Sequence, residues 1–275
     1  MTKRHMSGHY LYVNGRKFKG ALPLRALFYG EGLFETFRYR GGLPVYFGRH
    51  IERIKMGASV LGVPWPEQEF LESKAEEAAL DAGIDDAYMK ICLLSGGEGQ
   101  FYGSADSSTV LISLKPYTPY PDSVSICASS IHRNSSSPLS RIKTLNYLDN
   151  ILARREALDS GCDDALVLNE RSFIAEGTAS NVFWIKNGEL FTPSVNTGLL
   201  PGITRSILID LAEELGIVLR EGAYGLEDLY RADAAFLTNS LIGICVISSI
   251  DGHEKDTNNP QVYIINSRLK EALKW

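Results

Sequence analysis

Short runs of alternating apolar and polar residues at the start of the chain predict a small sheet. Residues 10–13, followed by Asn14-Gly15, are typical of a strand with a hairpin turn. Residues 32–39 and 44–47 flank Gly41-Gly42 and predict a second hairpin. We therefore expect the first part of the chain to be rich in β-structure.

Helical periodicity follows this pattern. Residues 51–61 carry apolar side chains three or four positions apart, which is typical of one face of a helix. Residues 66–82 are rich in Glu and Ala, begin with a proline and are followed by Gly83, so they predict a second helix with a clear start and end. Apolar runs at 88–94 and 109–114 predict two more strands, which complete an α+β unit.

A proline-rich segment separates this unit from the rest of the chain. Residues 115–121 contain three prolines, and proline lacks the backbone donor and the φ freedom that helices and strands require. We therefore expect a small α+β domain over residues 1–115, an interdomain linker over residues 116–123 and a larger α/β domain over residues 124–275.

Strands and helices alternate beyond the linker. The predicted strands cover residues 124–129, 165–168, 181–186 and 190–192, and the predicted helices cover about residues 146–160 and 204–215. This order is typical of a mixed α/β domain, so the sequence predicts a two-domain protein that combines the α+β and α/β classes.

Composition and charge exclude several classes of function. The 275 residues carry a formal net charge of -5, which gives a phosphate backbone no electrostatic attraction, so a nucleic-acid partner is not expected. The N-terminal residues lack the apolar core of a signal peptide, and the longest apolar run, residues 241–250, is too short to span a bilayer. We expect a cytoplasmic protein with no membrane partner.

Cysteines and histidines do not form a metal-binding pattern. The four cysteines include no CxxC pair and the five histidines are not clustered, so we expect reduced thiols and no metal. The GxxxxGK[ST], GxSxG and HExxH motifs are absent. Gly96-Gly97-Glu98-Gly99 lacks the spacing of a dinucleotide cradle, so it is interpreted as a loop that forms at most the rim of an active site.

Residues 198–205 form a loop that opens directly into a predicted helix. The free N–H groups and positive dipole end of such a helix can hold a phosphate, Gly202 allows close approach, and the Thr204 hydroxyl adds a donor. The same residues also fit an ordinary helix start with Thr204 as the N-cap. This segment alone does not distinguish the two interpretations.

Lys143 and Glu176 are single-residue candidates for chemistry. Lys143 lies between a predicted strand end at Ile142 and a helix with an apolar stripe, so its side chain would leave a rigid junction. The stripe consists of Leu145, Leu148, Ile151 and Leu152. Glu176 lies in a turn between two strand-like runs. A solvated lysine and a solvated hairpin carboxylate are the ordinary alternatives at these positions.

Several segments in a fixed order carry a family pattern. They are residues 29–38 (YGEGLFETFR), 50–54 (HIERI), 143–150 (KTLNYLDN), 175–177 (AEG), 180–183 (SNVF), 192–193 (TP), 198–205 (GLLPGITR) and 238–240 (TNS). By these segments the chain resembles the class IV aminotransferase family, enzymes of fold type IV that use pyridoxal 5'-phosphate (PLP). The family includes branched-chain and D-amino-acid aminotransferases and 4-amino-4-deoxychorismate lyases. The resemblance implies a two-domain, aminotransferase-like PLP fold.

The resemblance also implies roles for individual residues. Lys143 would hold PLP as a Schiff base and move protons as general base and acid. Glu176 would stabilise the protonated pyridine nitrogen, which makes the cofactor an electron sink. The other implied cofactor-binding positions are Arg53, Ile203, Thr204 and Ser240 around the phosphate, Tyr147 near the ring oxygen and Leu200 on the ring face. A homodimer is implied as well, because the family builds each active site at a subunit interface.

The pattern most resembles the lyases of the family, on Thr36 and residues 239–241. Tyr29, Thr36 and Arg38 are the candidate residues for binding a small amino substrate. Arg38 is a candidate for its carboxylate because residues 94–97 include no arginine. A branched-chain or D-amino-acid aminotransferase is the alternative, since the reactions share their cofactor chemistry, and a PLP-binding protein without turnover is a remote one.

Overall fold

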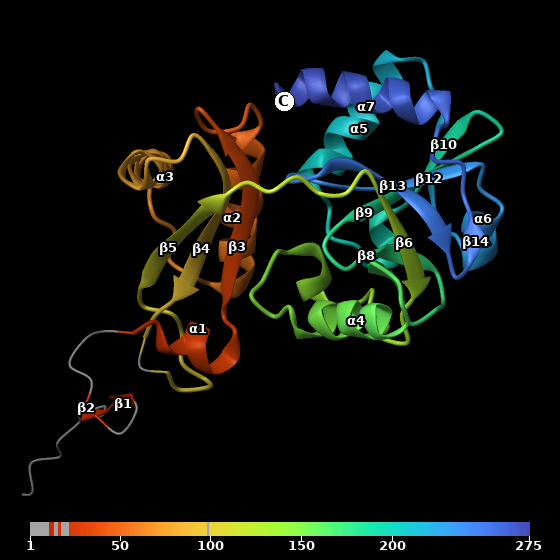
Figure 1. The fold of residues 1–275 in the computed structure, drawn as a ribbon. Coiled ribbons are helices and arrows are strands. Elements are labelled where there is room, and N and C mark those ends of the chain that lie inside the picture. The colour runs from red at the N-terminus through yellow and green to blue at the C-terminus, as the bar shows by residue number, and fades with distance from the viewer. Residues whose placement is uncertain (1–10, 14–15, 18–21, 98) are drawn as a thin grey trace, which may run out of the picture.

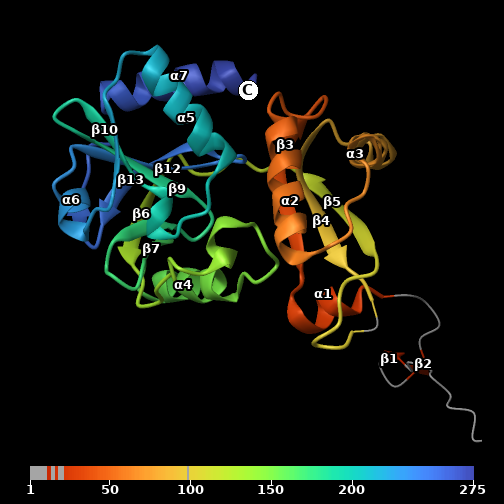
Figure 2. The ribbon, with the colours of Figure 1, turned by 180° about the vertical axis from the view of Figure 1, so that it is seen from behind.

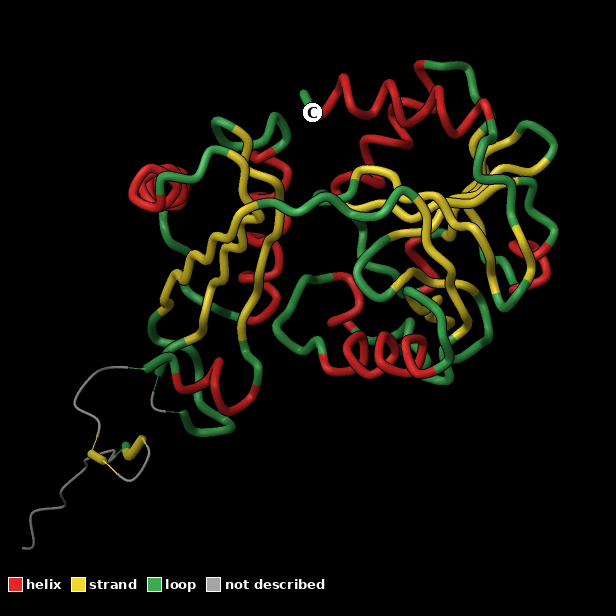
Figure 3. The backbone as a smooth tube through the Cα atoms, viewed as in Figure 1, coloured by secondary structure: helices red, strands yellow, loops and turns green. Residues whose placement is uncertain are grey.

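The computed structural model describes residues 11–13, 16–17, 22–97 and 99–275, and most of them form two units side by side (Figure 1). A three-stranded sheet with its helices forms the smaller unit, and a nine-stranded sheet with helices on both sides forms the larger one. An extended segment crosses between them at residues 117–122 (Figure 3). The predicted linker coincides with this crossing, while the domain boundaries themselves stay a prediction.

The smaller unit places two helices on one face of its sheet. Its elements are α1 (Leu24–Tyr29), β3 (Gly32–Arg40), α2 (Phe47–Leu61), α3 (Gln68–Ala82), β4 (Asp86–Ser95) and β5 (Ser108–Pro116). β4 lies between β3 and β5, and both pairs are antiparallel. Phe37 and Met89 are buried against α2 and α3, so neighbouring residues such as Thr36 and Lys90 point to the opposite face of the sheet. The two predicted helices and the strands of this unit are confirmed, except for one hairpin.

That hairpin, predicted around Gly41-Gly42, is wrong. Residues 44–46 form a turn, and α2 begins at Phe47, whose amide donates to the carbonyl of Pro44 at 2.9 Å. Phe47 belongs to the apolar stripe of α2 and packs edge-on against Phe37, with 5.3 Å between ring centroids. The helical period therefore overrides the short apolar run, and β3 pairs with the distant β4 along its whole length.

The hairpin predicted near the N-terminus is confirmed in its strands. β1 (Tyr12–Val13) and β2 (Arg16–Lys17) pair in antiparallel fashion. The predicted turn, Asn14-Gly15, lies outside the described residues.

The sheet of the larger unit has the strand order β11-β10-β9-β12-β13-β6-β7-β8, with β14 paired to β13. Its strands are β6 (Ser123–Ala128), β7 (Asp164–Leu168), β8 (Ile174–Gly177), β9 (Asn181–Lys186), β10 (Glu189–Pro193), β11 (Leu219–Gly222), β12 (Ala234–Asn239), β13 (Gly243–Ile250) and β14 (His253–Glu254). Its α-helices are α4 (Leu148–Asp159), α5 (Ile203–Glu214), α6 (Leu226–Tyr230) and α7 (Pro260–Leu273), and two 3-10 turns cover Pro138–Arg141 and Val195–Thr197. The strands and helices predicted beyond the linker are confirmed close to their predicted bounds.

β9 shows why this sheet is covered on both faces. Val182 and Trp184 are buried in one core cluster, while Phe183 and Ile185 are buried in the cluster formed with α5 and α7. An apolar run without alternation is typical of a strand with two buried faces. In Figure 2, α5 and α7 lie above the sheet and α4 lies below it.

The apolar stripe predicted for the helix after Lys143 does not face the core. Leu148, Ile151 and Leu152 of α4 are 72%, 41% and 49% exposed, whereas Ala153 and Ala157 are fully buried against β7. The small alanine side chains allow α4 to approach the sheet closely, and the leucine-rich side is left on the surface. α4 therefore presents an apolar face to solvent.

Several elements carry no prediction from the sequence. They are α1, α6, α7, β8 and β11 to β14. The start of α7 was readable, because Asn259 precedes Pro260 and its side chain accepts hydrogen bonds from the amides of the first turn. No helix in the described part of the chain is long and apolar enough to cross a membrane.

Two leucines of α3 provide a test of this packing. Leu71 is 1% exposed and Leu80 is 78% exposed. Leu71→Ala should lower the free energy of unfolding by about 2–5 kcal/mol, because it leaves a cavity in the core of the smaller unit. The matched change Leu80→Ala should stay within about 0.5 kcal/mol. Urea unfolding followed by circular dichroism measures both, and equal losses would contradict the described packing.

Candidate functional site

A cavity of about 270 Å³ lies where the two units meet, and both units line it. Most of the residues singled out in the sequence line this cavity. They are Thr36, Arg53, Lys143, Tyr147, Glu176, Leu200, Ile203, Thr204 and Ser240. Its volume is close to the lower end of the range for small-molecule sites, about 300–1,000 Å³.

Lys143 is held by main-chain pairing with β3. The Phe34 amide donates to the carbonyl of Lys143, and the Leu145 amide donates to the carbonyl of Gly32, both at 2.9 Å. The predicted strand end at Ile142 is wrong, because this residue, although extended, directly follows a 3-10 turn, and the bridge to β3 forms only at Thr144. The junction is nonetheless fixed from both sides.

The Lys143 ammonium lies in an aromatic and electropositive setting. It donates to the Tyr147 hydroxyl at 3.1 Å and lies 4.3 Å from the centroid of the Phe34 ring. Burial lowers the pKa of Lys143 to about 8, and the charge of Arg53 acts in the same direction. The amine is therefore neutral, and nucleophilic, at a pH where an exposed lysine is still charged.

Glu176 on β8 is buried and held by two donors. Arg133 donates to one carboxylate oxygen and the Leu200 amide to the other, each at 3.0 Å. Burial raises the pKa of Glu176, and both donors oppose that shift. A cationic group placed beside Glu176 would stabilise its anionic form further. The solvated-hairpin alternative for Glu176 is wrong, and Arg133 is a site residue that the sequence reading missed.

Arg53 on α2 is fixed by a buried acidic partner. Two of its nitrogens donate to the carboxylate of Glu35, at 2.7 and 2.6 Å, and the third donates to the carbonyl of Pro201 at 3.0 Å. His50 contacts the same carboxylate at 2.6 Å. Burial alone would raise the pKa of Glu35, but Arg53 and His50 lower it to about 2. Glu35 therefore stays charged and orients the guanidinium toward the start of α5.

The start of α5 is bare of side-chain caps. Gly202, not Thr204, is the N-cap, so the ordinary helix-start interpretation of Thr204 is wrong. A Cβ atom on Gly202 would approach Asn181 Oδ1 to 2.1 Å, so only glycine fits at this point. The hydroxyls of Thr204 and Ser240 lie 3.3 Å apart beside the first turn. Hydroxyl, backbone and guanidinium donors thus converge, which is the arrangement that phosphate groups need.

Thr36 and Lys90 lie side by side on the sheet wall of the cavity. They are direct partners in the β3–β4 register, so both side chains point to the same face. The Lys90 ammonium lies 4.2 Å from the centroid of the Phe34 ring, the same ring that Lys143 contacts. The sequence analysis considered only an arginine at the end of β4 as a carboxylate-binding group, so Lys90 in the middle of this strand was missed.

Two candidate substrate residues do not reach this cavity. Arg38 donates to both carboxylate oxygens of Asp86, at 2.7 and 2.5 Å, and its guanidinium lies 3.9 Å from the centroid of the Tyr117 ring. Tyr29 donates to the carbonyl of Gly99 at 2.7 Å. Within one chain, neither residue lines the cavity around Lys143, so their role in substrate binding stays a prediction.

The donor set fits PLP. The cofactor carries an aldehyde, a basic pyridine nitrogen and a phosphate, and the cavity offers a buried amine of low pKa, a buried carboxylate and a cluster of phosphate donors. Within the described part of the chain, no group of three His, Cys, Asp or Glu side chains is placed to hold a metal ion.

Comparison with known proteins agrees with the fit of this site to PLP. A family model described as amino-transferase class IV matches residues 32–250. A putative branched-chain-amino-acid aminotransferase of Methanocaldococcus jannaschii is 33% identical over 276 residues, covering 96% of this chain and 95% of the relative. The aminodeoxychorismate lyase of Bacillus subtilis is 34% identical over 254 residues, covering 88% and 86%. The crystal structure of a putative 4-amino-4-deoxychorismate lyase from Legionella pneumophila superposes with a TM-score of 0.88 at 30% identity, covering 93% and 96%.

The role of the Arg53 fork can be tested by Arg53→Lys. Lysine keeps the charge but cannot bind Glu35 through two N–H groups and also reach the Pro201 carbonyl. We expect the dissociation constant of PLP, measured by absorbance titration of the cofactor-free protein, to rise by at least about tenfold. Arg49→Lys is the control on the same helix, since Arg49 pairs with the exposed Asp210. An unchanged affinity in Arg53→Lys would remove Arg53 from phosphate binding.

The low pKa of Lys143 predicts a distinct labelling profile. In the cofactor-free protein, Lys143 should be protonated and unreactive toward a small acylating reagent below pH 8 and reactive above it. Lys55, an exposed lysine of α2, is the matched control in the same experiment. Mass mapping of modified lysines across a pH series measures both midpoints. Equal midpoints would contradict the buried setting of Lys143.

Proposed function

The chain belongs to the class IV aminotransferase family, and from this premise we propose that it is a 4-amino-4-deoxychorismate lyase. Such an enzyme releases pyruvate from its substrate and leaves 4-aminobenzoate. That the protein is a PLP-dependent enzyme follows from the family. The choice of reaction within the family is the proposal.

Each end of the cofactor has residues to hold it. We assign the covalent attachment to Lys143, the pyridine nitrogen to Glu176, and the phosphate to Arg53 with the start of α5 and the hydroxyls of Thr204 and Ser240. Leu200 and Tyr147 would flank the ring. When bound, PLP supplies an electron sink for the carbon that carries the substrate amine.

Side chains of the protein carry out and assist the proton transfers. The Lys143 amine, with a pKa of about 8, can take a proton from the substrate carbon and return it at neutral pH. The Tyr147 hydroxyl, 3.1 Å away, keeps the amine oriented, and burial raises the pKa of this hydroxyl so that it stays protonated. Arg133 donates to Glu176 and favours its charged form against the effect of burial.

The pairing of Thr36 with Lys90 is the observation that carries the lyase proposal. Elimination of pyruvate requires a donor near the leaving enolpyruvyl group and a cation for its carboxylate. Thr36 supplies a hydroxyl and Lys90 an ammonium on the same wall of the cavity, and Lys90 and Lys143 contact the same Phe34 ring. The side chain of a branched-chain substrate is an alkyl group, which does not match the hydroxyl and ammonium groups of this wall.

A branched-chain or D-amino-acid aminotransferase is the second candidate. The same Lys143 and Glu176 would serve it, and the similarity to the Methanocaldococcus relative supports it. Lys90 would then bind the second carboxylate of a dicarboxylic amino donor. The two candidates differ in where nitrogen goes, which an experiment can follow.

A homodimer and a cytoplasmic location belong to the same proposal. The exposed apolar face of α4, formed by Leu148, Ile151 and Leu152, supports association with a second copy of the chain. Tyr29 does not line the cavity of its own chain. Across a subunit interface it would be able to line the cavity of the second copy.

Lyase and aminotransferase are separated by the fate of the amino group. We expect the holoenzyme to convert aminodeoxychorismate into equal amounts of 4-aminobenzoate and pyruvate, because a lyase regenerates its bound PLP in each cycle. Leucine, valine, glutamate and D-alanine, given without an acceptor, should bleach the absorbance of bound PLP at least about a hundredfold more slowly. Rapid bleaching with no 4-aminobenzoate formed would reject the lyase and leave the aminotransferase.

Lys90→Gln is the matching variant for this experiment. It should raise KM for aminodeoxychorismate by at least about tenfold and leave PLP binding unchanged, because Lys90 forms no described hydrogen bond or ion pair with Arg53, Thr204 or Ser240. Lys115→Gln on β5 is the control, since this lysine belongs to the same sheet but does not line the cavity. Equal effects of the two changes would remove Lys90 from substrate binding.

The dimer is tested on α4. Ile151→Glu places a charge in the exposed apolar face and should shift the protein from dimer to monomer in analytical ultracentrifugation. Leu80→Glu introduces the same charge at an exposed leucine of α3 and should leave the dimer intact. A wild-type protein that sediments as an active monomer would contradict the proposal.

A further inference from the structure

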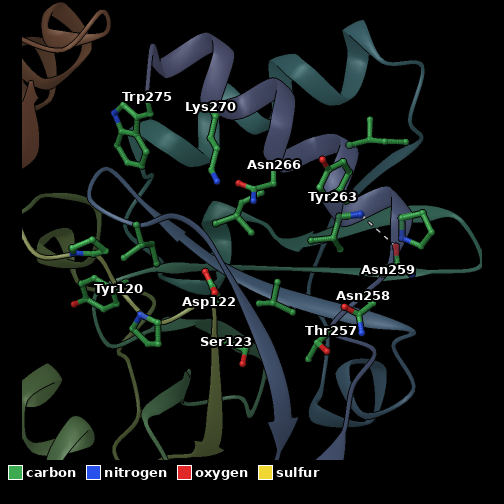
Figure 4. Close-up of a pocket in the computed structure, with 18 of the residues that line it drawn as sticks. Tyr120, Asp122, Ser123, Thr257, Asn258, Asn259, Tyr263, Asn266, Lys270 and Trp275 are labelled. Carbon is green, nitrogen blue, oxygen red and sulfur yellow. Dashed lines mark hydrogen bonds between the residues drawn. The ribbon is translucent and has the colours of Figure 1, made fainter.

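A second and larger cavity, about 980 Å³, is lined mainly by the larger unit, with Arg38 of β3 contributed by the smaller one (Figure 4). α7, β13 and the segment that leads into β6 line it. Its volume falls within the range for small-molecule sites, about 300–1,000 Å³. Nothing in the proposed reaction uses this cavity.

Two opposite charges line the cavity without partners. Lys270 extends from α7, and Asp122 lies on the segment across from it (Figure 4). Neither side chain forms an ion pair or a hydrogen bond with another residue among those that the structure describes. The amide of Asn266, one helical turn before Lys270, adds a neutral polar group beside the ammonium. A ligand here meets a cationic pole and an anionic pole in one hollow.

The walls between the poles are aromatic and aliphatic. Tyr120 and Trp275 contribute rings, and Ile244 and Val246 of β13 contribute alkyl groups. Apolar walls with a few polar groups are typical of small-molecule sites, and flat side chains pack well against rings. The ligand chemistry that matches all these groups has a carboxylate, an ammonium and an aromatic body.

We propose that this cavity binds an aromatic α-amino acid in its zwitterionic form. The carboxylate pairs with Lys270 and the Asn266 amide, the ammonium pairs with Asp122, and the side chain packs between Tyr120 and Trp275. The site is independent of whether the enzyme acts as lyase or aminotransferase.

The cavity is connected to the active site through short contacts. Tyr120 lines both cavities, and the Tyr117 hydroxyl donates to the carbonyl of Leu241 at 2.7 Å. The Arg38 amide donates to the carbonyl of Ser240 at 3.3 Å. Since PLP binding and this cavity share these neighbours, the test must keep the active site filled while it measures binding elsewhere.

Borohydride-reduced holoenzyme meets this need, because its cofactor is fixed in the Lys143 cavity and cannot react with an added amine. We expect L-phenylalanine or L-tryptophan to bind it saturably, with one site per chain, in isothermal titration calorimetry. Phenethylamine lacks the carboxylate and 3-phenylpropionate lacks the ammonium, so each should bind at least about tenfold more weakly. Absence of amino-acid binding, or equal binding of the three classes of compound, overturns the proposal.

Variants locate the bound ligand. Lys270→Gln and Asp122→Asn each remove one pole and should each weaken amino-acid binding at least about tenfold, with thermal unfolding unchanged because both side chains are exposed. Lys55→Gln is the matched control, an exposed helical lysine outside both cavities. Full binding in either of the two cavity variants, or an equal loss in Lys55→Gln, overturns the assignment. Loss of the proposed lyase activity would leave these binding results untouched.

Discussion

The active site depends on a main-chain pairing between two parts of the chain that lie more than a hundred residues apart. The segment that carries Lys143 extends the edge of β3, through the Phe34 amide and the Gly32 carbonyl. β3 belongs to the smaller unit, whereas Lys143 lies shortly before the start of α4 in the larger one. Backbone hydrogen bonds fix the position of a segment to a fraction of an ångström. The amine of Lys143 and the sheet wall of the cavity therefore keep fixed positions relative to each other.

Charged side chains around the cavity occur as ion pairs. Glu35 holds Arg53, and Arg133 holds Glu176, so two buried acids of the site are each paired with an arginine. Lys143 is different, because among its described contacts it meets a phenol and an aromatic ring rather than a carboxylate. The result is a lysine that loses its proton more easily than an exposed one, which nucleophilic and proton-transfer chemistry both require.

Much of the site could be predicted from the sequence, because family segments are contiguous runs. Lys143, Glu176 and Arg53 lie within such runs, and the structure brings them to one cavity. Lys90 and Arg133 lie in no such run. Lys90 reaches the cavity through the strand register, and Arg133 acts on the cavity residue Glu176 through an ion pair between distant segments. Neither relation can be seen in the order of residues along the chain.

The errors in the fold have a similar origin. The sequence correctly showed where α4 lies and which of its side chains form an apolar stripe, but not that this stripe faces solvent, since apolar residues usually point inward. In this helix Ala153 and Ala157 fill the narrow space over β7, and bulk decides which side faces the sheet. The turn at residues 44–46 shows the same limit, because the longer helical period of α2 determined the local structure.

Gly202 shows how unevenly the site can accept change over evolutionary time. A single methyl group there would push Asn181, whose amide donates to the Leu200 carbonyl at 2.9 Å, while the Leu200 amide donates to Glu176. The disturbance would thus pass from the start of α5 to Glu176 through two neighbouring residues. Among the described contacts, Lys90 on the sheet wall is linked to Lys143 only through the Phe34 ring, which both ammonium groups contact. Substitutions along that wall should therefore disturb fewer contacts of the site than a side chain added at position 202.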